Sequence, residues 1–410
     1  MFNRPLLPEA LMDLARLRTG LSDFGEWPFQ EPLAVLLRSY QEEAGLTAFG
    51  RVAVRWDMVR FLSNLLRLRA EEKNDRGIVG EQIQAPIFLL GLPRSGTTFL
   101  HNLMAQDPAN LTPQAWQTIY PYPPVAHQRN SSDPRRRIVE RQFAAFLRIA
   151  PELPSLHPLK AGAPQECIDI TGHVMRSMRF DTTHYVPSYE RWLDGAGHRE
   201  AYQFHKRFLQ HLQHQTRSGQ WVLKSPDHIF ALDALLEVYP DARFVFIHRD
   251  PLRVLSSVAK LTEILREPFA RKVDRLQIGR QVTERWRQGA SLLIDTSMQL
   301  DGSPNRVFHL KYKRLARDPM AAIAALYQHF GLPLGAEAQS RMKFFVAAQS
   351  RGEGYVRNTY NLALYGLNRE QERRRYHDYL SFFRVESEDG VDSATHTPEQ
   401  QVIEKAALDF

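Results

Sequence analysis

The sequence predicts an α/β protein in which helices flank both faces of a central parallel sheet. Apolar runs with the length of buried strands occur at residues 87–90, 221–223, 243–247 and 307–312. Helical spacing of apolar residues follows each run, and this alternation favours parallel strands joined by crossover helices. We therefore expect a three-layer α/β/α arrangement with an N-terminal helical extension before it.

The 410 residues divide into three predicted segments. Residues 1–80 form a helical extension, because helical patterns begin near Pro8 and Pro32 and a long amphipathic one follows. Residues 81–385 form the α/β domain, and a hydrophobic content of 43% is enough for a sizeable core. Residues 386–410 are acidic and poor in large apolar side chains, so we expect a loosely held C-terminal tail.

Within the α/β domain, further helices are expected at residues 135–150, 165–179, 200–217, 270–300 and 319–330. Two proline-rich connections, at 112–134 and 151–165, lie beside the first of these helices. Long connections inside a compact domain are commonly functional covers, and the aromatic residues here indicate packing or substrate contact.

The composition of the chain indicates which class of ligand and which cellular compartment to expect. The net charge of +7 suits a polyanionic ligand, although no motif for reading RNA or DNA accompanies it. Cys167 is the only cysteine, which excludes a disulfide framework and indicates a reducing compartment. The N-terminus lacks the apolar core of a signal peptide, and no run of about 18 apolar residues occurs. We therefore expect a cytoplasmic protein without a membrane span.

One group of histidines could suggest a metal site. His205, His211 and His214 share one predicted helix, but neither an HExxH pattern nor a carboxylate partner completes the motif. We expect these histidines on a polar helix surface and predict no metal site.

A candidate phosphate-binding loop follows the first predicted strand. Gly91 to Gly96 forms a glycine- and proline-containing loop, and helical spacing begins at Thr97. A strand, a glycine loop and a helix N-terminus together direct backbone N–H groups toward an anion. Arg94 adds a cation, and Ser95 and the threonines that follow add hydroxyl donors.

This loop departs from the Walker A motif G-x-x-x-x-G-K-[ST] at one position. Gly91 and Gly96 have the required spacing, but Thr97 stands where the lysine belongs. That lysine contacts the β- and γ-phosphates of a nucleoside triphosphate, and the next hydroxyl binds magnesium. The loop is therefore suited to hold a phosphate but poorly equipped for γ-phosphoryl transfer, and its cation is Arg94.

Two more cations are expected at the same edge of the sheet. Lys224 ends the strand at 221–223, and Arg249 follows the strand at 243–247. Because ligands of parallel sheets bind at the carboxyl ends of the strands, Lys224, Arg249 and the Gly91 loop should lie together. The sequence thus predicts a site for several phosphate-like groups.

Together these blocks resemble the sulfotransferases that use 3'-phosphoadenosine-5'-phosphosulfate (PAPS), in particular their bacterial branch. The similarity covers roughly residues 30–380. LPRSGTTFL (92–100) is similar to the family's 5'-phosphosulfate loop, and FIHRDPLRVLSS (246–257) to its 3'-phosphate segment. The resemblance implies a P-loop-NTPase-like fold and sulfuryl transfer from PAPS to a hydroxyl or amine, with no metal and with adenosine 3',5'-bisphosphate as product.

The resemblance also implies roles for individual residues. Arg249 and Ser257 would bind the 3'-phosphate, and Phe99 would stack on adenine, where relatives often have tryptophan. Arg357 is the best candidate for a late basic loop on the 3'-phosphate side. The residues implied for the 5'-phosphosulfate are Arg94, Ser95, Gly96, Thr97 and Thr98.

In-line attack on sulfur requires cations near the transferred group and a base for the acceptor proton. Arg94 and Lys224 are the implied cations. Glu166 is the first candidate for the base, because relatives show a Pro-Glu-Glu stretch where this chain has Pro-Gln-Glu. His228 is the second. Gln117, which replaces a glutamate common in bacterial relatives, cannot act as a base.

Two other functions remain open at this point. A P-loop kinase would need the missing lysine and a Walker B aspartate, and a non-catalytic adenosine bisphosphate-binding protein would fit Gln117. The acceptor is also open among small molecules, including hydroxylated lipids, polyketides, phenols and sugars. The first 80 residues leave a homodimer open.

Overall fold

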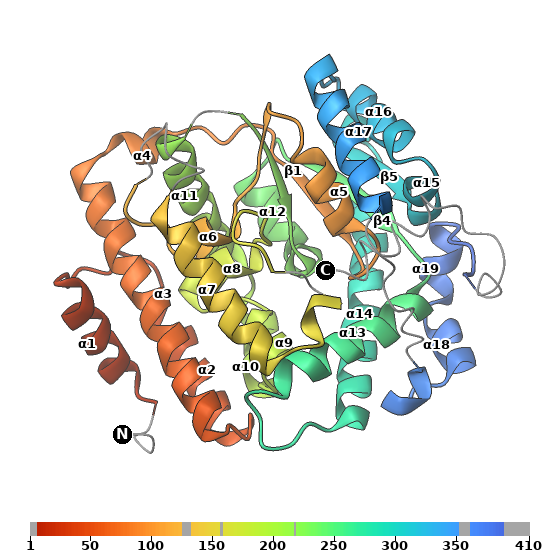
Figure 1. The fold of residues 1–410 in the computed structure, drawn as a ribbon. Coiled ribbons are helices and arrows are strands. Elements are labelled where there is room, and N and C mark those ends of the chain that lie inside the picture. Colours follow the sequence, from red (N-terminus) through yellow and green to blue (C-terminus); the bar gives the residue numbers. More distant parts are fainter. Residues whose placement is uncertain (1–5, 125–132, 156–158, 217–218, 352–360, 389–410) are drawn as a thin grey trace.

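The computed structural model describes residues 6–124, 133–155, 159–216, 219–351 and 361–388, with the side chains of residues 350 and 351 left out (Figure 1). Its sheet has five parallel strands in the order β2-β3-β1-β4-β5. The strands are β1 (Ile87–Gly91), β2 (Asn110–Leu111), β3 (Gln220–Lys224), β4 (Arg243–His248) and β5 (Val307–Lys311). The predicted central parallel sheet is confirmed.

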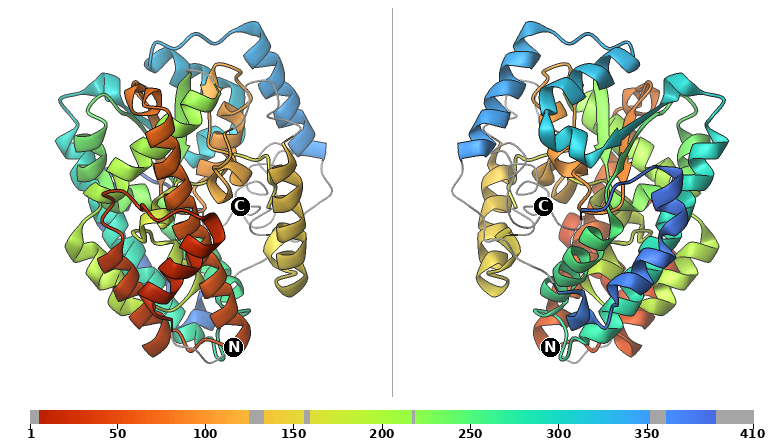
Figure 2. Two further views of the ribbon diagram at one scale, coloured as in Figure 1. Left: turned by 90° about the vertical axis from the view of Figure 1, so that its left-hand side faces the viewer. Right: turned by 90° about the vertical axis from the view of Figure 1, so that its right-hand side faces the viewer.

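Helices cover both faces of this sheet (Figures 1 and 2). Successive residues of a strand point to opposite faces, and β1 follows this rule. Ile87 and Leu89 pack in one hydrophobic cluster with α5, α16 and α17, whereas Phe88 and Leu90 pack in a larger cluster with α11, α13 and α14. The predicted three-layer α/β/α arrangement follows from this alternation.

The helices begin close to the predicted positions, and several start with proline. Their bounds are α1 (Pro8–Thr19), α2 (Gln30–Glu42), α3 (Ala48–Asn74), α4 (Gly77–Gly80), α5 (Thr97–Met104), α6 (Ala115–Ile119), α7 (Pro134–Ile149), α8 (Ile168–Thr171), α9 (Arg179–Thr183), α10 (Pro187–Ala196), α11 (Arg199–Gln215), α12 (Leu232–Val238), α13 (Pro251–Arg266), α14 (Arg275–Gln299), α15 (Tyr312–Arg317), α16 (Pro319–His329), α17 (Ala336–Arg351), α18 (Arg369–Arg375) and α19 (His377–Phe382). None of the helices in the described ranges is long and apolar enough to cross a membrane.

The N-terminal helices belong to the same core as the sheet. Leu33 of α2 and Phe61 and Leu65 of α3 are buried in the larger cluster, together with Phe88 of β1. Residues 6–80, the described part of this segment, therefore pack directly against the α/β part of the chain. Helix α3 also carries charged residues toward the site described below.

The prediction of a single helix over residues 165–179 is wrong. The chain instead forms the short helix α8, one 3₁₀ turn (Gly172–Val174) and then α9. Met175 has a φ of 54°, in the left-handed region that interrupts helices. Its carbonyl accepts a hydrogen bond of 2.8 Å from the Tyr189 hydroxyl of α10, so a tertiary contact stabilises the break.

The carboxyl ends of the strands meet at one edge, as predicted. In the register of the sheet, Leu89 pairs with Lys224 and Gly91 pairs with Ile247. His248, the last residue of β4, pairs with Lys311 of β5. The loop after β1 therefore lies between the residues that follow β3 and β4.

Gly91 is the position where this pairing leaves no space for a side chain. A Cβ atom there would lie 2.5 Å from the carbonyl oxygen of Ile247. Gly91→Ala should therefore lower the free energy of unfolding by about 1–3 kcal/mol, measured by chemical denaturation. Gly302→Ala, where an added Cβ meets nothing within 4 Å, is the matched control and should change it by less than about 0.5 kcal/mol. Equal effects of the two substitutions would contradict this explanation.

Candidate active site

The loop between β1 and α5 has the backbone of an anion-binding turn. Arg94 and Gly96 both have positive φ values, 66° and 91°, and this pair of residues turns the chain into α5. A left-handed conformation is costly for arginine, so the surrounding structure must hold it there. No side chain caps the start of α5 at Gly96. Its first N–H groups, which lack partners within the helix, are therefore suited to a bound anion.

Ser95 lies at the centre of this loop. Its side chain is fully buried, and its hydroxyl oxygen has no hydrogen-bond partner among the residues that the structure describes. A buried polar atom without a partner is unfavourable, and a ligand that accepts or donates a hydrogen bond would relieve the cost. Thr97 is also buried, and Thr98 is half-buried beside it.

The two motifs that resemble the PAPS-binding segments contact each other directly. The Nε of Arg94 donates a hydrogen bond of 3.0 Å to the Ser257 hydroxyl of α13. In the other direction, the Nη1 of Arg249 donates a bond of 2.8 Å to the carbonyl oxygen of Arg94. The sequence predicted separate contacts of these residues with a ligand. The structure adds that Ser257 and Arg249 hold the strained Arg94 in place.

Arg249 has two further neighbours that sequence reasoning missed. Its guanidinium lies 3.9 Å from the centre of the Tyr312 ring, at the start of α15. The Nη2 atom of the same guanidinium lies 3.0 Å from a carboxylate oxygen of Glu388, and the two side chains form an ion pair. Tyr312 directly follows β5 and could have been found from its place at a strand end. Glu388 lies 139 positions from Arg249 and carried no local signal.

Glu166 and Lys224, predicted independently as base and cation, are brought together. The Lys224 ammonium donates a short hydrogen bond to a carboxylate oxygen of Glu166. The Lys224 side chain is buried, whereas that of Glu166 keeps 22% of its surface exposed. The cation is thus inside the protein, and the carboxylate is at the boundary that a substrate could reach.

The backbone around Glu166 is fixed at the end of β3. The N–H of Cys167 donates a bond of 2.9 Å to the carbonyl oxygen of Lys224, and the N–H of Gln165 donates one of 2.7 Å to that of Pro113. A β-bridge between Gln114 and Pro164 continues this pairing. Lys224 therefore positions the glutamate through its main chain as well as its side chain.

A chain of ion pairs behind Glu166 reaches the N-terminal helices. Arg179 pairs with Asp169 at 2.6 Å and with Asp57 of α3 at 2.9 Å. Gln165 donates a short hydrogen bond to the other oxygen of Asp169. Helix α3 thus supports the segment that carries the candidate base, a role for the first 80 residues that the sequence did not indicate.

Gln117 has a structural explanation. It occupies the third position of α6, where its side-chain oxygen accepts a bond of 2.9 Å from the backbone N–H of Gln114 in a capping box. The neighbouring Trp116 is fully buried under the guanidinium of Arg135, 4.7 Å from the ring centre. The side-chain amide of Gln117 therefore stabilises the start of α6.

Two predicted site residues lie in the core instead. His228 is fully buried, its Nδ1 lies 2.6 Å from the Tyr202 hydroxyl, and its ring packs against Phe88. Burial holds the pKa of His228 well below its usual value, so the imidazole resists protonation. These observations favour Glu166 over His228 as the candidate base, and the choice between them stays a prediction.

Phe99 is the second predicted site residue in the core. Its ring is fully buried in the cluster between α5 and the sheet, 5.9 Å from the ring of Phe345 in α17. Helical periodicity places position 99 on the face of α5 that covers the sheet, so no aromatic face is free for adenine. Arg357, the candidate in the late basic loop, lies outside the described residues.

The histidines of α11 are also not the polar surface that the sequence indicated. His205 is buried 2.7 Å from the Tyr239 hydroxyl, and His211 is buried against Glu72. His214 alone is partly exposed, between Asp75 and Glu81. Among the described residues, no cluster of three or more His, Cys, Asp or Glu could hold a metal ion.

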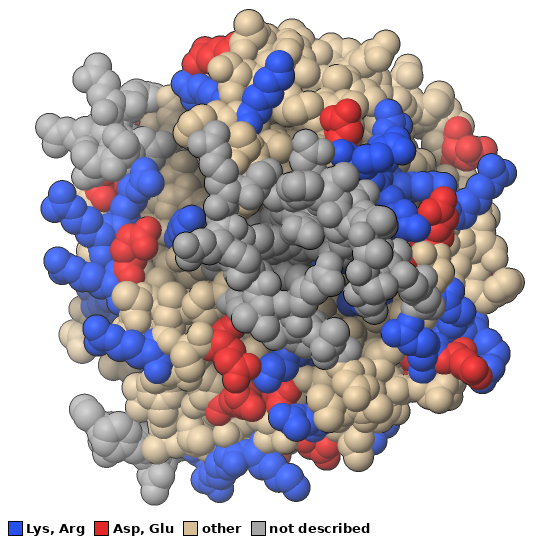
Figure 3. Space-filling model, turned by 45° about the vertical axis from the view of Figure 1, so that its right-hand side comes forward, with Lys and Arg blue, Asp and Glu red and all other residues tan. Residues whose placement is uncertain are grey.

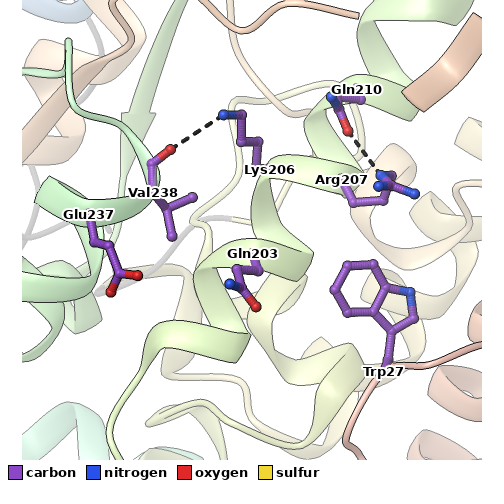
Figure 4. Close-up of a pocket in the computed structure, with 7 residues that line it drawn as sticks. All are labelled: Trp27, Gln203, Lys206, Arg207, Gln210, Glu237 and Val238. Atoms are coloured by element: carbon purple, nitrogen blue, oxygen red, sulfur yellow. Dashed lines mark hydrogen bonds between the residues drawn. The ribbon is translucent and has the colours of Figure 1, made fainter. Parts of the chain in front are cut away.

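Two further features of the surface lie outside the candidate site residues described above. The face in Figure 3 carries Lys and Arg side chains together with Asp and Glu side chains. A separate hollow of about 450 Å³ lies on the outside of α11 and α12 and includes none of the candidate site residues (Figure 4). Its lining residues are Trp27, Gln203, Lys206, Arg207, Gln210, Glu237 and Val238.

Comparison with known proteins decides the family. A model described as the sulfotransferase family matches residues 86–336, more than half of the chain. The chain belongs to the sulfotransferase family. The matched region contains the loop after β1, Glu166, Lys224, Arg249 and Ser257. The family that the sequence resembled is therefore confirmed.

Relatives of this sulfotransferase include solved and curated proteins. The crystal structure of sulfotransferase STF9 from Mycobacterium avium superposes with a TM-score of 0.86 at 29% identity, covering 94% of this chain and 98% of that one. Sulfotransferase STF1 from Mycobacterium tuberculosis H37Rv gives a TM-score of 0.80 at 32% identity, covering 91% and 98%.

Among curated sequences, the omega-hydroxy-beta-dihydromenaquinone-9 sulfotransferases Stf3 of Mycobacterium bovis and Mycobacterium tuberculosis are 27% identical over 274 residues. The alignment covers 60% of this chain and 63% of the Stf3 length. This sulfotransferase therefore spans less than two thirds of those relatives.

The buried histidines predict acid-sensitive folding. Burial lowers the pKa of His101, His173, His184 and His205 to about 3 and that of His198 to about 4. Each binds a proton at pH 4–6.5 only when the chain unfolds, so each removes up to about 1.4 kcal/mol of stability per pH unit as the pH falls below 6.5.

Two buried carboxyl groups act in the opposite direction, because burial raises the pKa of Asp227 and Glu190 to about 7. The histidines outweigh them. The free energy of unfolding near pH 5.5 should thus be about 3 kcal/mol lower than near pH 7.5, measured by chemical denaturation. A stability that is constant or rises on acidification would show that these imidazoles are protonated in the folded protein.

Proposed function

We propose that the protein transfers a sulfuryl group from PAPS to a hydroxyl of a small-molecule acceptor. The observation that carries this proposal is the arrangement at the carboxyl ends of β3, β1 and β4. There the Lys224–Glu166 pair lies beside the Arg94 loop. Arg94 donates a hydrogen bond to Ser257 of α13, and Arg249 donates one to the Arg94 carbonyl oxygen. The family and its fold support the same reaction class.

The residues fit an anionic nucleotide of this kind. The buried Ser95 hydroxyl has no partner in the described part of the chain, and the start of α5 is not capped. The left-handed Gly96 lies close to Tyr312, whose ring would be 3.3 Å from a Cβ at that position. Ser95, Gly96, Thr97 and Thr98 would hold the 5'-phosphosulfate, and Arg249 the 3'-phosphate.

When bound, PAPS supplies the sulfuryl group and a stable bisphosphate leaving group. Arg94 stabilises negative charge at the transferred group, because a guanidinium remains protonated and cannot serve as a general acid. Lys224 supplies a second, buried cation next to the carboxylate of Glu166. Two fixed cations in a water-poor site stabilise developing charge more strongly than they would in water.

Glu166 accepts the proton of the acceptor hydroxyl as the new O–S bond forms. Its ionised form is the basic one, and this carboxylate accepts a hydrogen bond from the Lys224 ammonium. Proton transfer to Glu166 would leave Lys224 as the uncompensated cation at the moment when negative charge builds on the transferred group. The pair thus couples proton removal to charge stabilisation.

A hydroxylated lipid is the first acceptor class to test. The curated relatives are named for an omega-hydroxylated dihydromenaquinone, a lipid with a hydroxyl group. We propose a panel of hydroxylated prenyl quinones, fatty alcohols, phenols, polyketides and sugars, incubated with PAPS and screened by mass spectrometry for addition of a sulfuryl group. Transfer to one class identifies the acceptor, and ATP-dependent transfer of phosphate instead would favour a kinase.

The 3'-phosphate assignment predicts a selective binding defect. Arg249→Lys keeps the charge but loses bidentate contact, so the affinity for adenosine 3',5'-bisphosphate should fall about 10- to 100-fold. Affinity for adenosine 5'-monophosphate should change less than about threefold. Calorimetry of both ligands measures this, with Arg280→Lys, an exposed position on α14, as control. Equal losses for both nucleotides would contradict the assignment.

The base assignment predicts a defect in turnover. Glu166→Gln should lower kcat about 10²- to 10⁴-fold while adenosine 3',5'-bisphosphate still binds. His228→Asn keeps an acceptor for Tyr202 and should lower kcat less than about tenfold, because the ring is in the core. If steady-state assays show a larger loss of kcat for His228→Asn than for Glu166→Gln, His228 is the better candidate for the base. Tight bisphosphate binding by the wild type without transfer to any acceptor would favour a non-catalytic binding protein.

A further inference from the structure

We propose that the segment Glu386–Glu388 of this chain occupies the 3'-phosphate site and competes there with PAPS. The carboxylate of Glu388 takes the place of the phosphate on Arg249, so the donor must displace the segment to bind. This inference rests on the proposed function, since it concerns the same site. It assigns a role to the start of the tail that the sequence predicted to be loosely held.

The contact between Glu388 and Arg249 has the geometry of anion recognition. Nε of Arg249 lies 3.1 and 3.3 Å from the two carboxylate oxygens, and Nη2 donates a bond of 3.0 Å to one of them. This is the fork with which arginine binds carboxylates and phosphates alike. Only 8% of either side chain is exposed, so the pair is inside the protein.

The rest of the segment is held by other cations of the same region. Lys313 pairs with Glu386 at 2.7 Å, and Arg373 donates a bond of 2.8 Å to the Ser387 hydroxyl. Arg253 donates a bond of 3.0 Å to the carbonyl oxygen of Glu388. The acidic segment is therefore bound as a ligand would be, by basic side chains from α13, α15 and α18.

The main chain of Glu388 is also placed by the strand-end motif. Its N–H donates a bond of 3.0 Å to Asp250, whose other carboxylate oxygen caps α13. Just before the segment, the ring of Phe383 stacks on His248, the last residue of β4, at 3.9 Å. The end of α19 is thus anchored beside β4, and from there the chain reaches Arg249 in five residues.

A phosphate and this carboxylate cannot share the fork of Arg249. Both carry negative charge and need the Nε and Nη2 donors, and the site is too enclosed for water to screen them. The pairing also avoids the large cost of a buried unpaired guanidinium in the protein without ligand. The docked segment therefore lowers the apparent affinity for any 3'-phosphorylated nucleotide, because only the fraction of molecules with the segment undocked can bind it.

Glu388→Gln tests the competition, because the amide keeps the shape but loses the charge. Adenosine 3',5'-bisphosphate should bind about tenfold or more tightly to this variant than to the wild-type chain, measured by calorimetry. Adenosine 5'-monophosphate, which lacks the 3'-phosphate, should bind both with affinities that differ less than about twofold. Glu386→Gln is the matched control in the same segment. Its exposed pair with Lys313 is weak, so the affinity should change less than about threefold.

A second measurement follows the segment itself. Cys167 is the only natural cysteine and is buried, so Ser387→Cys introduces one reactive thiol. Its rate of labelling by a thiol reagent should rise with adenosine 3',5'-bisphosphate and stay constant with adenosine 5'-monophosphate. Displacement with tighter binding by Glu388→Gln supports the inference.

The other outcomes overturn it in distinguishable ways. Equal or weaker bisphosphate binding by Glu388→Gln, with an unchanged labelling rate, shows that Glu388 is a structural partner of Arg249 and leaves the proposed function intact. Failure of wild type and variant alike to bind the bisphosphate overturns the proposed function together with this inference. Thermal unfolding of each variant, measured beforehand, confirms that the comparison is between folded proteins.

Discussion

The close pairing of β1 with its two neighbours is the constraint on which the site depends. β1 lies between β3 and β4, and at its last residue the backbone approaches Ile247 so closely that only glycine fits. Because the strands are parallel, this pairing brings three chain segments to one edge at once. Arg94 of the loop lies 130 positions before Lys224 and 155 before Arg249, so their proximity is a property of the sheet.

At that edge, the site is built from like charges that the fold holds near each other. Arg94 and Arg249 are both mostly buried, and a hydrogen bond from the side chain of one to the backbone of the other connects them. Neutral groups make up much of the support: a serine hydroxyl, a carbonyl oxygen and the tyrosine face. Such support adds no negative charge, whereas Glu388 and Glu166 are acidic groups that pair with cations of this edge.

The sequence predicted the parts of this structure that local patterns determine. The strand, loop and helix from Ile87 to Met104 and the cation after β4 follow from apolar runs and from glycine spacing. Other features depend on contacts across the fold. Phe99 is buried because it lies on the face of α5 that covers the sheet. The helix after Glu166 is interrupted at a residue whose carbonyl oxygen contacts Tyr189. The Arg249–Glu388 pair joins segments with no shared pattern, so no local reading of the sequence could reveal it.

The attachment of Glu166 has a consequence for how acceptor preference can change. Two backbone hydrogen bonds, one to Lys224 and one to Pro113, hold the residues on either side of it. Backbone bonds of this kind do not depend on the side chains of the proline-rich covers around them. Side chains of the covers can therefore vary while the proposed base stays at the end of β3, provided the backbone at Pro113 keeps its place. On the proposed function, residues that recognise the acceptor could therefore change without moving the group that takes its proton.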